Sequence, residues 1–293
     1  MRLSALVCVA TVAAMCVAAE LAPPAREIPL YGGTAPGSEN WTWSERMVTS
    51  PGGMPMAQNV VRPVLLYYPA PKGAAVGTAM IVAPGGGFRN LMMSYEGVDV
   101  ARRMNELGVD ALVLKYRLIY TDPNAPAQSP GGRAGVPGAG PQAGQNVREL
   151  AGADGQQAVR VARQHAAEFG VRPDRIGMIG YSAGGAVVLA AATGPVDARP
   201  NFAAAIYAAG AGAAQPPADG APPMFIAVAA DDQAVGYQGS LDLFGAWRKA
   251  SVPVELHVFQ TGAHGFSKKG GGADRYLDRL EEWMRVNGWL TRP

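Results

Sequence analysis

Apolar and polar positions along the chain alternate between two patterns. Runs that are apolar, or that alternate with a period of two as strands do, occupy residues 60–68, 78–83, 110–116, 176–179, 202–207, 224–229 and 254–259. Stretches with helical periodicity or composition cover residues 98–107, 154–169, 186–191, 237–250 and 274–286. Continuous apolar runs are typical of strands that are buried on both faces. Their alternation with helices predicts an α/β fold in one domain, with a mainly parallel central sheet and helices on both faces.

Two features of the sequence mark where helices begin and end. Glycine follows the periodic stretches at Gly108 and Gly170, where its tolerance of positive φ makes it a common C-cap. Asp154 and Gln157 have the spacing of a capping box, whose side chains satisfy the first backbone amides of a helix. We therefore expect one helix to begin at Asp154 and to end before Gly170.

One connection departs from this alternation. Residues 121–150 are dense in Gly, Pro and Ala, and they contain few large apolar side chains. Connections of this length are usually functional or disordered. We expect low-complexity disorder here, and a partial rim over the active site is the alternative.

The first residues have the pattern of an export signal. Arg2 gives a positive start, residues 3–18 carry no charge, and small side chains precede Glu20. This pattern predicts a secretory signal peptide over residues 1–19, because the run is short and alanine-rich for a membrane span. The protein is then expected to be secreted or periplasmic, without a stable membrane anchor after cleavage.

The remaining chain is expected to divide into two parts. Residues 20–56 are rich in Pro, Gly, Ser and Asn, which favours a segment that lies on the surface of the core. Residues 57–293 carry the strand and helix patterns and form the predicted catalytic domain. Trp41 and Trp43 are expected to anchor the segment, and a platform that stacks on a sugar is the alternative.

The composition supports a filled core and excludes several kinds of site. Hydrophobic residues make up 48% of the 293 residues and charged residues 16%, which argues against disorder. The formal net charge is +2 without long runs of like charge, so nothing favours binding to nucleic acid or to an anionic membrane. Cys8 and Cys16 both fall within the predicted signal peptide. A cysteine nucleophile or a thiolate metal site is therefore excluded in the mature chain.

A candidate nucleophile follows the apolar run at residues 176–179. The segment Gly180-Tyr181-Ser182-Ala183-Gly184 matches the pattern Gly-x-Ser-x-Gly, and a helix-forming stretch comes after it. Such a sharp strand-to-helix turn forces the serine toward positive φ and requires small neighbours. We expect Ser182 to be a nucleophile, and a glycine-rich turn with an incidental serine is the alternative.

A serine nucleophile needs a base, and the chain has three histidines. His165 lies in a predicted helix and His257 within a predicted strand, which favours structural roles for both. His264 lies in a loop of small residues just after the last predicted strand. Loops at the carboxyl ends of strands form the sites of open α/β sheets, so we expect His264 to be the base.

The base in turn needs an acid that orients it. Asp231 and Asp232 directly follow the predicted strand at residues 224–229. The order serine, aspartate, histidine along the chain is that of α/β-hydrolases. Because side chains alternate along an extended segment, only one of the two aspartates can reach the imidazole of His264.

Acyl transfer also needs backbone donors for the oxyanion that forms. The amide of Ala183 opens a helix directly after the candidate nucleophile. The loop Gly85-Gly86-Gly87 ends a predicted central strand, and its three glycines allow the backbone to approach a substrate closely. We expect this loop to supply the second set of donors, and an ordinary β–α turn is the alternative.

Taken together, these motifs resemble the secreted bacterial α/β-hydrolase esterases of the acetylxylan-esterase type, neighbours of the hormone-sensitive-lipase-like group. The resemblance spans residues 60–290 and rests on Ala83-Pro84-Gly85-Gly86-Gly87-Phe88, Lys115-Tyr116-Arg117-Leu118, Asp174-Arg175-Ile176-Gly177, Gly180-Tyr181-Ser182-Ala183-Gly184-Gly185, Asp232 with Val235, and Gly262-Ala263-His264-Gly265-Phe266. It implies the α/β-hydrolase fold, Ser182 as nucleophile and Asp232 with His264 as its relay. It also implies Gly86, Gly87 and Ala183 as oxyanion donors.

The expected function is that of a serine carboxylic-ester hydrolase that works through an acyl-enzyme, with no cofactor and no metal. Export and the resemblance favour acetyl or other small acyl groups on carbohydrate esters, either small molecules or oligosaccharides. The alternatives are a feruloyl-type esterase, a serine peptidase of the same fold, and a binding module on an inactive hydrolase scaffold.

Overall fold

The computed structural model describes residues 21–122, 124, 146–213, 217, 219–268 and 272–292. The predicted signal peptide and most of the glycine- and proline-rich connection lie outside these residues. Export, the proposed division of the chain and the disorder of that connection therefore stay predictions.

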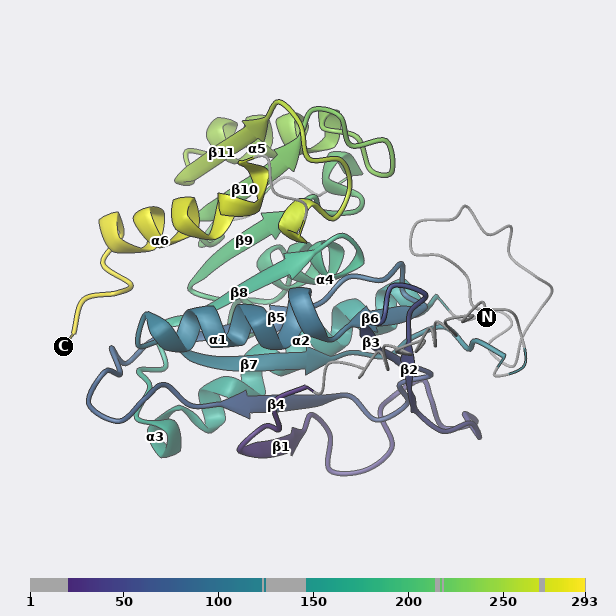
Figure 1. Ribbon diagram of the computed structural model, residues 1–293. Coiled ribbons are helices and arrows are strands. Elements are labelled where there is room, and N and C mark those ends of the chain that lie inside the picture. The colour runs from purple at the N-terminus through teal and green to yellow at the C-terminus, as the bar shows by residue number, and fades with distance from the viewer. Residues whose placement is uncertain are drawn as a thin grey trace, which may run out of the picture.

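The centre of the molecule is an eight-stranded sheet (Figure 1). Its strands lie in the order β1 (Arg26–Pro29), β4 (Val64–Tyr68), β7 (Asp110–Lys115), β5 (Ala79–Ala83), β8 (Ile176–Tyr181), β9 (Phe202–Ile206), β10 (Met224–Ala229) and β11 (Val254–Phe259). β4 pairs antiparallel with β1 and β7, and the other neighbouring strands pair in parallel. Every residue of β5, β8, β9 and β10 is buried, as continuous apolar runs require. The predicted α/β class and mainly parallel sheet are confirmed.

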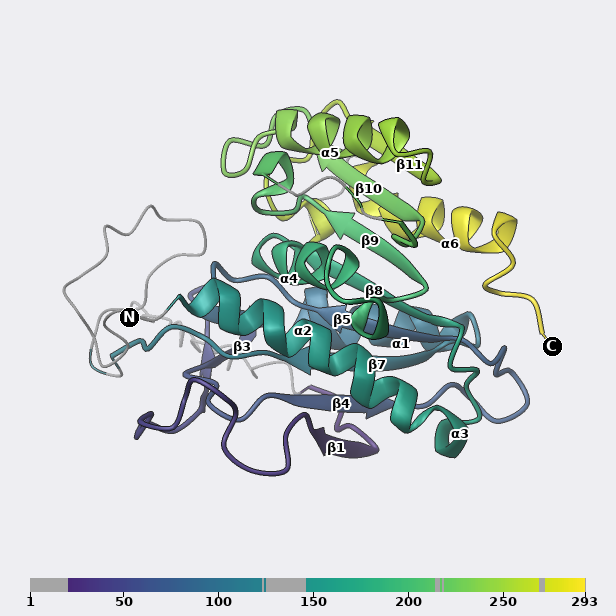
Figure 2. The same cartoon turned by 180° about the vertical axis from the view of Figure 1, so that it is seen from behind.

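Helices cover both faces of this sheet. α1 (Asp99–Glu106) and α6 (Tyr276–Val286) lie on the face seen in Figure 1, and α2 (Val147–Gln164), α4 (Ala183–Ala192) and α5 (Gln238–Lys249) lie on the face seen in Figure 2. The shorter helices are α3 (Ala166–Phe169), the π-helix η1 (Ser94–Val98) and the 3₁₀ turns η2 (Val196–Ala198), η3 (Ala211–Ala213), η4 (Phe266–Lys268) and η5 (Ala273–Arg275). In the described part of the chain, no helix is long and apolar enough to cross a membrane.

The segment at residues 20–56 contributes strands that its composition did not predict. β1 forms an edge of the main sheet, and β2 (Arg46–Thr49) pairs with β3 (Pro55–Gln58), which in turn pairs with β6 (Asn90–Met92). Trp41 is buried, and its ring stacks on Trp43 with 4.7 Å between the ring centroids. The ring of Trp43 also contacts that of Tyr120, with 5.3 Å between the centroids, so the pair links this segment to the chain after β7.

The predicted start of the long helix at Asp154 is wrong. α2 begins at Val147, and the side chain of Asn146 accepts a hydrogen bond from the amide of Glu149. The Glu149 carboxylate in turn accepts from the Asn146 side chain at 2.7 Å. Asp154 lies in the middle of the helix and is fully buried, so it cannot act as a cap. The helix was also expected to continue to residue 169, but α2 ends at Gln164, and Gly170, with a φ of 70°, ends the separate helix α3.

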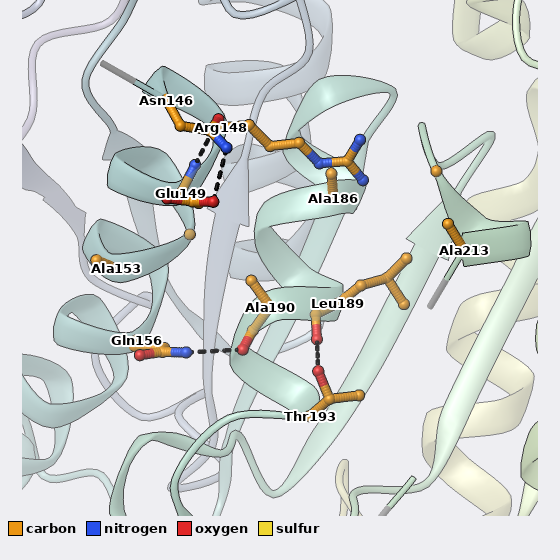
Figure 3. Close-up of a pocket in the computed structure, with 12 residues that line it drawn as sticks. Asn146, Arg148, Glu149, Ala153, Gln156, Ala186, Leu189, Ala190, Thr193 and Ala213 are labelled. Carbon is orange, nitrogen blue, oxygen red and sulfur yellow. Dashed lines mark hydrogen bonds between the residues drawn. The ribbon is translucent and has the colours of Figure 1, made fainter. Parts of the chain in front are cut away.

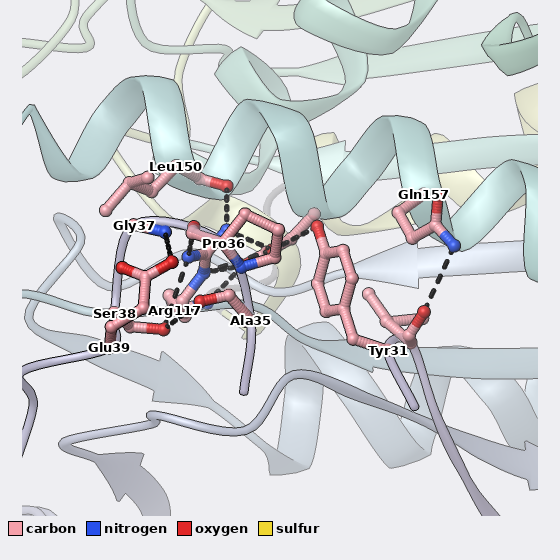
Figure 4. Close-up of polar contacts among 11 residues, drawn as sticks. Tyr31, Ala35, Pro36, Gly37, Ser38, Glu39, Arg117, Leu150 and Gln157 are labelled. Atoms are coloured by element: carbon pink, nitrogen blue, oxygen red, sulfur yellow. Dashed lines mark hydrogen bonds and ion pairs between the residues drawn. The ribbon is translucent and has the colours of Figure 1, made fainter. Parts of the chain in front are cut away.

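Asp154 instead forms a buried ion pair with Arg117. Arg117 is 1% exposed and donates to Asp154 Oδ1 from its Nη2 at 2.7 Å. The guanidinium also donates to the carbonyls of Pro36 and Leu150 (Figure 4). One cation, two residues after the end of β7, thereby joins the N-terminal segment to α2.

Removing one partner of this pair should strongly destabilise the protein. Arg117→Met leaves the Asp154 carboxylate buried without its cation, and we expect the free energy of unfolding to fall by about 3–5 kcal/mol. Urea denaturation followed by circular dichroism measures this loss. Arg172→Met, which breaks the exposed pair with Asp174, is the matched control and should shift the midpoint little. Equal midpoints for the two variants would contradict the prediction.

Candidate active site

Ser182 lies at a strained turn between β8 and α4. Its φ of 50° and ψ of −115° are unusual for a residue with a side chain. The turn closes because glycines surround it: a Cβ on Gly180 would lie 2.3 Å from the carbonyl oxygen of Gly184. A Cβ on Gly184 would lie 2.0 Å from the carbonyl oxygen of Ala83, at the end of β5. The small residues of the Gly-x-Ser-x-Gly segment are therefore required by the geometry.

His264 and Asp232 reach this turn from two other loops. His264 Nε2 lies 2.9 Å from Ser182 Oγ, and His264 Nδ1 lies 2.8 Å from Asp232 Oδ2. Asp232 follows β10 and His264 follows β11, so all three residues lie at the carboxyl edge of the sheet. The three side chains form one line of hydrogen bonds, in the serine, histidine, aspartate order that acyl transfer needs.

Asp232 is fixed by its own loop. It is 3% exposed, and its Oδ1 accepts from the amides of Ala234 at 2.8 Å and Val235 at 3.1 Å. Burial raises the pKa of Asp232, but the hydrogen bonds from His264 and from these amides outweigh burial and hold it below its ordinary value. The carboxyl is therefore ionised at neutral pH, as an acceptor for an imidazole N–H must be.

Asp231 points elsewhere. Its Oδ1 accepts from the amide of Ala263 at 2.7 Å, and this bond lowers the pKa of Asp231. Ala263 precedes His264 and has a φ of 53°. Asp231 thus ties the loop that carries the histidine to the loop that carries Asp232, while Asp232 contacts the imidazole.

The glycine loop after β5 lies against the serine. A Cβ on Gly85 would come within 3.0 Å of Ser182 Cβ. Gly86 has a φ of 134° and Gly87 a φ of 64°, and a Cβ on Gly86 would lie 2.1 Å from the carbonyl oxygen of Asn90. Among the described residues, the amides of Gly86, Gly87 and Ala183 have no acceptor. These N–H groups are available to a bound molecule.

The sequence of this chain matches one family over more than half of its length. Residues 132–292 match the dienelactone hydrolase family. The chain belongs to the dienelactone hydrolase family. The matched part contains β8 with Ser182 and the loops that carry Asp232 and His264.

A curated relative is of the esterase type that the sequence motifs resemble. The chain is 24% identical over 246 residues to an acetylxylan esterase from Xylanibacter ruminicola. The match covers 71% of this chain but 45% of that protein, so the chain spans less than half the length of this curated relative.

Solved structures show that the chain has the fold of α/β-hydrolase esterases. An acetyl ester-xyloside bifunctional hydrolase from Caldicellulosiruptor lactoaceticus superposes with a TM-score of 0.64 at 23% identity, covering 91% of this chain and 98% of the other. A butyrate-bound esterase from Thermogutta terrifontis gives a TM-score of 0.61 at 23% identity, covering 78% and 91%. The predicted α/β-hydrolase fold is confirmed.

The two remaining histidines of this dienelactone hydrolase family member lie away from Ser182. His165 caps α2 and its Nδ1 lies 2.8 Å from Glu168 Oε2. His257 lies on β11 with its Nε2 2.7 Å from Glu255 Oε1. Across the described ranges, no group of three or more His, Cys, Asp or Glu side chains could hold a metal ion.

A cavity of about 530 Å³ lies between α2 and α4, beside the turn at Ser182 (Figure 3). Two of its lining residues border that turn. The amide of Ala186 donates to the carbonyl of Ser182, and Gly210 follows Ala209, whose amide donates to the same carbonyl at 2.8 Å. The side chain of Arg148 extends across the cavity over Ala186 (Figure 3). Ser182, Asp232 and His264 are not among the residues that line this cavity.

Two further polar residues, Glu96 and Tyr207, lie beside the site and were not predicted from the sequence. Glu96 is 3% exposed and Tyr207 is fully buried, and they contact each other. A signal for Glu96 was present, since it is the first acid after the glycine loop and has apolar neighbours in residues 91–93 and Val98. Tyr207 follows β9 and gave no signal of its own.

Proposed function

We propose that this protein is a serine ester hydrolase that works through an acyl-enzyme. The observation that carries the proposal is the hydrogen-bonded line from Ser182 through His264 to Asp232, at a strained strand-to-helix turn. Membership of a hydrolase family supports it. Asp232 is buried at one end of this line, whereas the side chain of His264 is 26% exposed, so a molecule from solvent can reach the imidazole.

In the proposed mechanism, the three side chains share one proton-transfer task. His264 Nε2 takes the proton of Ser182 Oγ as the oxygen attacks the ester carbonyl, and the imidazolium then protonates the leaving alkoxide. Asp232 fixes the tautomer in which Nδ1 carries a proton and stabilises the imidazolium. A water molecule, deprotonated by the same nitrogen, then attacks the acyl-enzyme and releases the carboxylic acid.

The oxyanion of each tetrahedral intermediate would lie between two sources of backbone donors. Gly86 and Gly87 supply N–H groups from the loop after β5, and Ala183 supplies the first amide of α4. Preorganised donors of this kind stabilise the developing charge without reorganisation during the reaction. Their lack of acceptors among the described residues supports this role.

Acetyl or other small acyl groups on carbohydrate esters are the proposed substrates. The acetylxylan esterase of Xylanibacter ruminicola and the acetyl ester-xyloside hydrolase of Caldicellulosiruptor lactoaceticus support this class. The Thermogutta terrifontis esterase carries butyrate or propionate, which are also short acids. A feruloyl ester is the competing substrate, because it differs mainly in the size of the acyl group.

The test is a substrate series with the purified protein and its Ser182→Ala variant. We expect turnover of p-nitrophenyl acetate, a decline toward longer acyl chains, and release of acetate from acetylated xylo-oligosaccharides. Faster turnover of feruloyl esters would show that these, and not acetyl esters, are the preferred substrates. No turnover of any ester by a folded protein would favour a binding module and reject the proposal.

A further inference from the structure

Glu96 places a carboxylate on the buried side of the glycine loop. It is 3% exposed and belongs to the π-helix η1, a distortion often found at functional sites. Its Oε2 accepts from the amide of Gly85 at 2.8 Å, and its Oε1 accepts from the hydroxyl of Tyr207 at 2.7 Å. One carboxylate therefore joins the loop after β5 to the residue that follows β9.

The bond to Gly85 fixes the loop that carries the proposed oxyanion donors. A Cβ on Gly85 would lie 2.7 Å from Glu96 Oε2 and 3.0 Å from Ser182 Cβ, so this residue is held between the carboxylate and the serine. Gly86 and Gly87 follow at positive φ. A rotation of the Gly85 peptide would therefore move the two amides that follow it.

The bond to Tyr207 reaches the other half of the site. The Tyr207 ring meets the imidazole of His264 with 5.0 Å between centroids and an interplanar angle of 63°. The Tyr207 hydroxyl also lies 3.2 Å from Ser267 Oγ, in the turn after His264. Burial, followed by the nearby Glu96, raises the pKa of Tyr207 well above its ordinary value, so the hydroxyl stays a donor. The tyrosine therefore contacts the imidazole with its ring and the turn after His264 with its hydroxyl.

We propose that Glu96 is a positioning residue. It holds the glycine loop after β5 and His264 in their relative positions, through the Gly85 amide on one side and the Tyr207 ring on the other. The inference rests on the proposed esterase function. Through these two bonds, Glu96 acts on the reaction by way of Gly85 and Tyr207. Burying a carboxylate costs free energy, and this cost is explained if the positions of the glycine loop and His264 depend on Glu96.

Two substitutions separate the two contacts. Glu96→Gln retains an acceptor for the Gly85 amide but removes the charge and presents an NH₂ group to Tyr207. Tyr207→Phe keeps the ring against His264 and removes the hydroxyl alone. We expect Glu96→Gln to lower kcat for p-nitrophenyl acetate by about 10- to 100-fold, since small misplacement of reacting groups is costly. We expect Tyr207→Phe to act in the same direction, with KM changed by less than about threefold in both.

A second buried carboxyl provides a matched control. Asp110, at the amino end of β7, is also 3% exposed. It likewise accepts from one tyrosine hydroxyl, that of Tyr67 at 2.7 Å, and from one amide, that of Ala70 at 3.2 Å. Asp110→Asn and Tyr67→Phe therefore remove the same kinds of bond at the opposite edge of the sheet. They should lower the melting temperature without lowering kcat.

Binding of a boronic acid gives a readout that a structural role would not move. Phenylboronic acid forms a tetrahedral adduct on a serine nucleophile, so its Ki should rise in parallel with the loss of kcat/KM in Glu96→Gln. A kcat within twofold of wild type in folded Glu96→Gln and Tyr207→Phe would overturn the inference, and so would an equal loss in Asp110→Asn. An inactive wild type would instead reject the esterase proposal itself.

Discussion

Replacing Ser182 or His264 with alanine is expected to lower kcat for ester hydrolysis by about 10³-fold or more, and the double variant should be little worse. The reason is the 2.9 Å contact between Ser182 Oγ and His264 Nε2. Without the imidazole the serine is a weak nucleophile, and without the serine the imidazole has no proton to accept. Because both residues take part in the same proton transfer, removing the second after the first should lower kcat little further.

Turnover of p-nitrophenyl acetate by the two single variants and the double variant measures this non-additivity. Ser240→Ala and His257→Ala are the matched controls, since Ser240 is a buried serine in α5 and His257 lies on β11. Neither control should change kcat. Losses that multiply in the double variant would show that the two residues act independently.

Asp232→Asn is expected to lower kcat by up to about 10⁴-fold, because an amide favours the wrong tautomer of the histidine. The Asp232 carboxylate accepts from His264 Nδ1 at 2.8 Å, and an Asn side chain can turn its NH₂ group toward that nitrogen. The fold of the loop should persist, since an amide oxygen can still accept from Ala234 and Val235.

The neighbouring aspartate is the natural control for this substitution. Asp231 accepts from the amide of Ala263 and does not contact the imidazole, so Asp231→Asn should cost less than about tenfold in kcat. Its main effect should be a lower melting temperature, as the tie between the two loops weakens. Measuring kcat and melting temperature for both variants decides the roles, and the reverse order in kcat would assign the relay to Asp231.

The strands and the loops at their ends could be predicted because burial on both faces leaves a plain record in the sequence. β10 begins and ends where its apolar run does, and every residue in it is buried. The turn at Ser182 could also be predicted from the sequence, since its close contacts allow only small residues at Gly180 and Gly184. Local constraints of this kind do not depend on the rest of the chain.

What could not be predicted depends on contacts between distant residues. Asp154 has the local spacing of a cap, but it pairs with Arg117 and lies within a helix that begins seven residues earlier, at Val147. β1 joins the sheet through its pairing with β4, although its own residues show no strand pattern. Glu96 acquires its partners from Gly85 and Tyr207, which only the folded sheet brings together.

The order of strands in the sheet also has a consequence for the recovery of the protein after denaturation. From β8 to β11 the strands are added outward in chain order, and the histidine follows the outermost strand. Chains of this size commonly refold through partly structured intermediates. An intermediate that holds β5, β8 and β9 would already contain the serine turn and the glycine loop, yet it would lack both the acid and the base. Regain of activity therefore reports the docking of β10 and β11, and it should lag behind the regain of secondary structure.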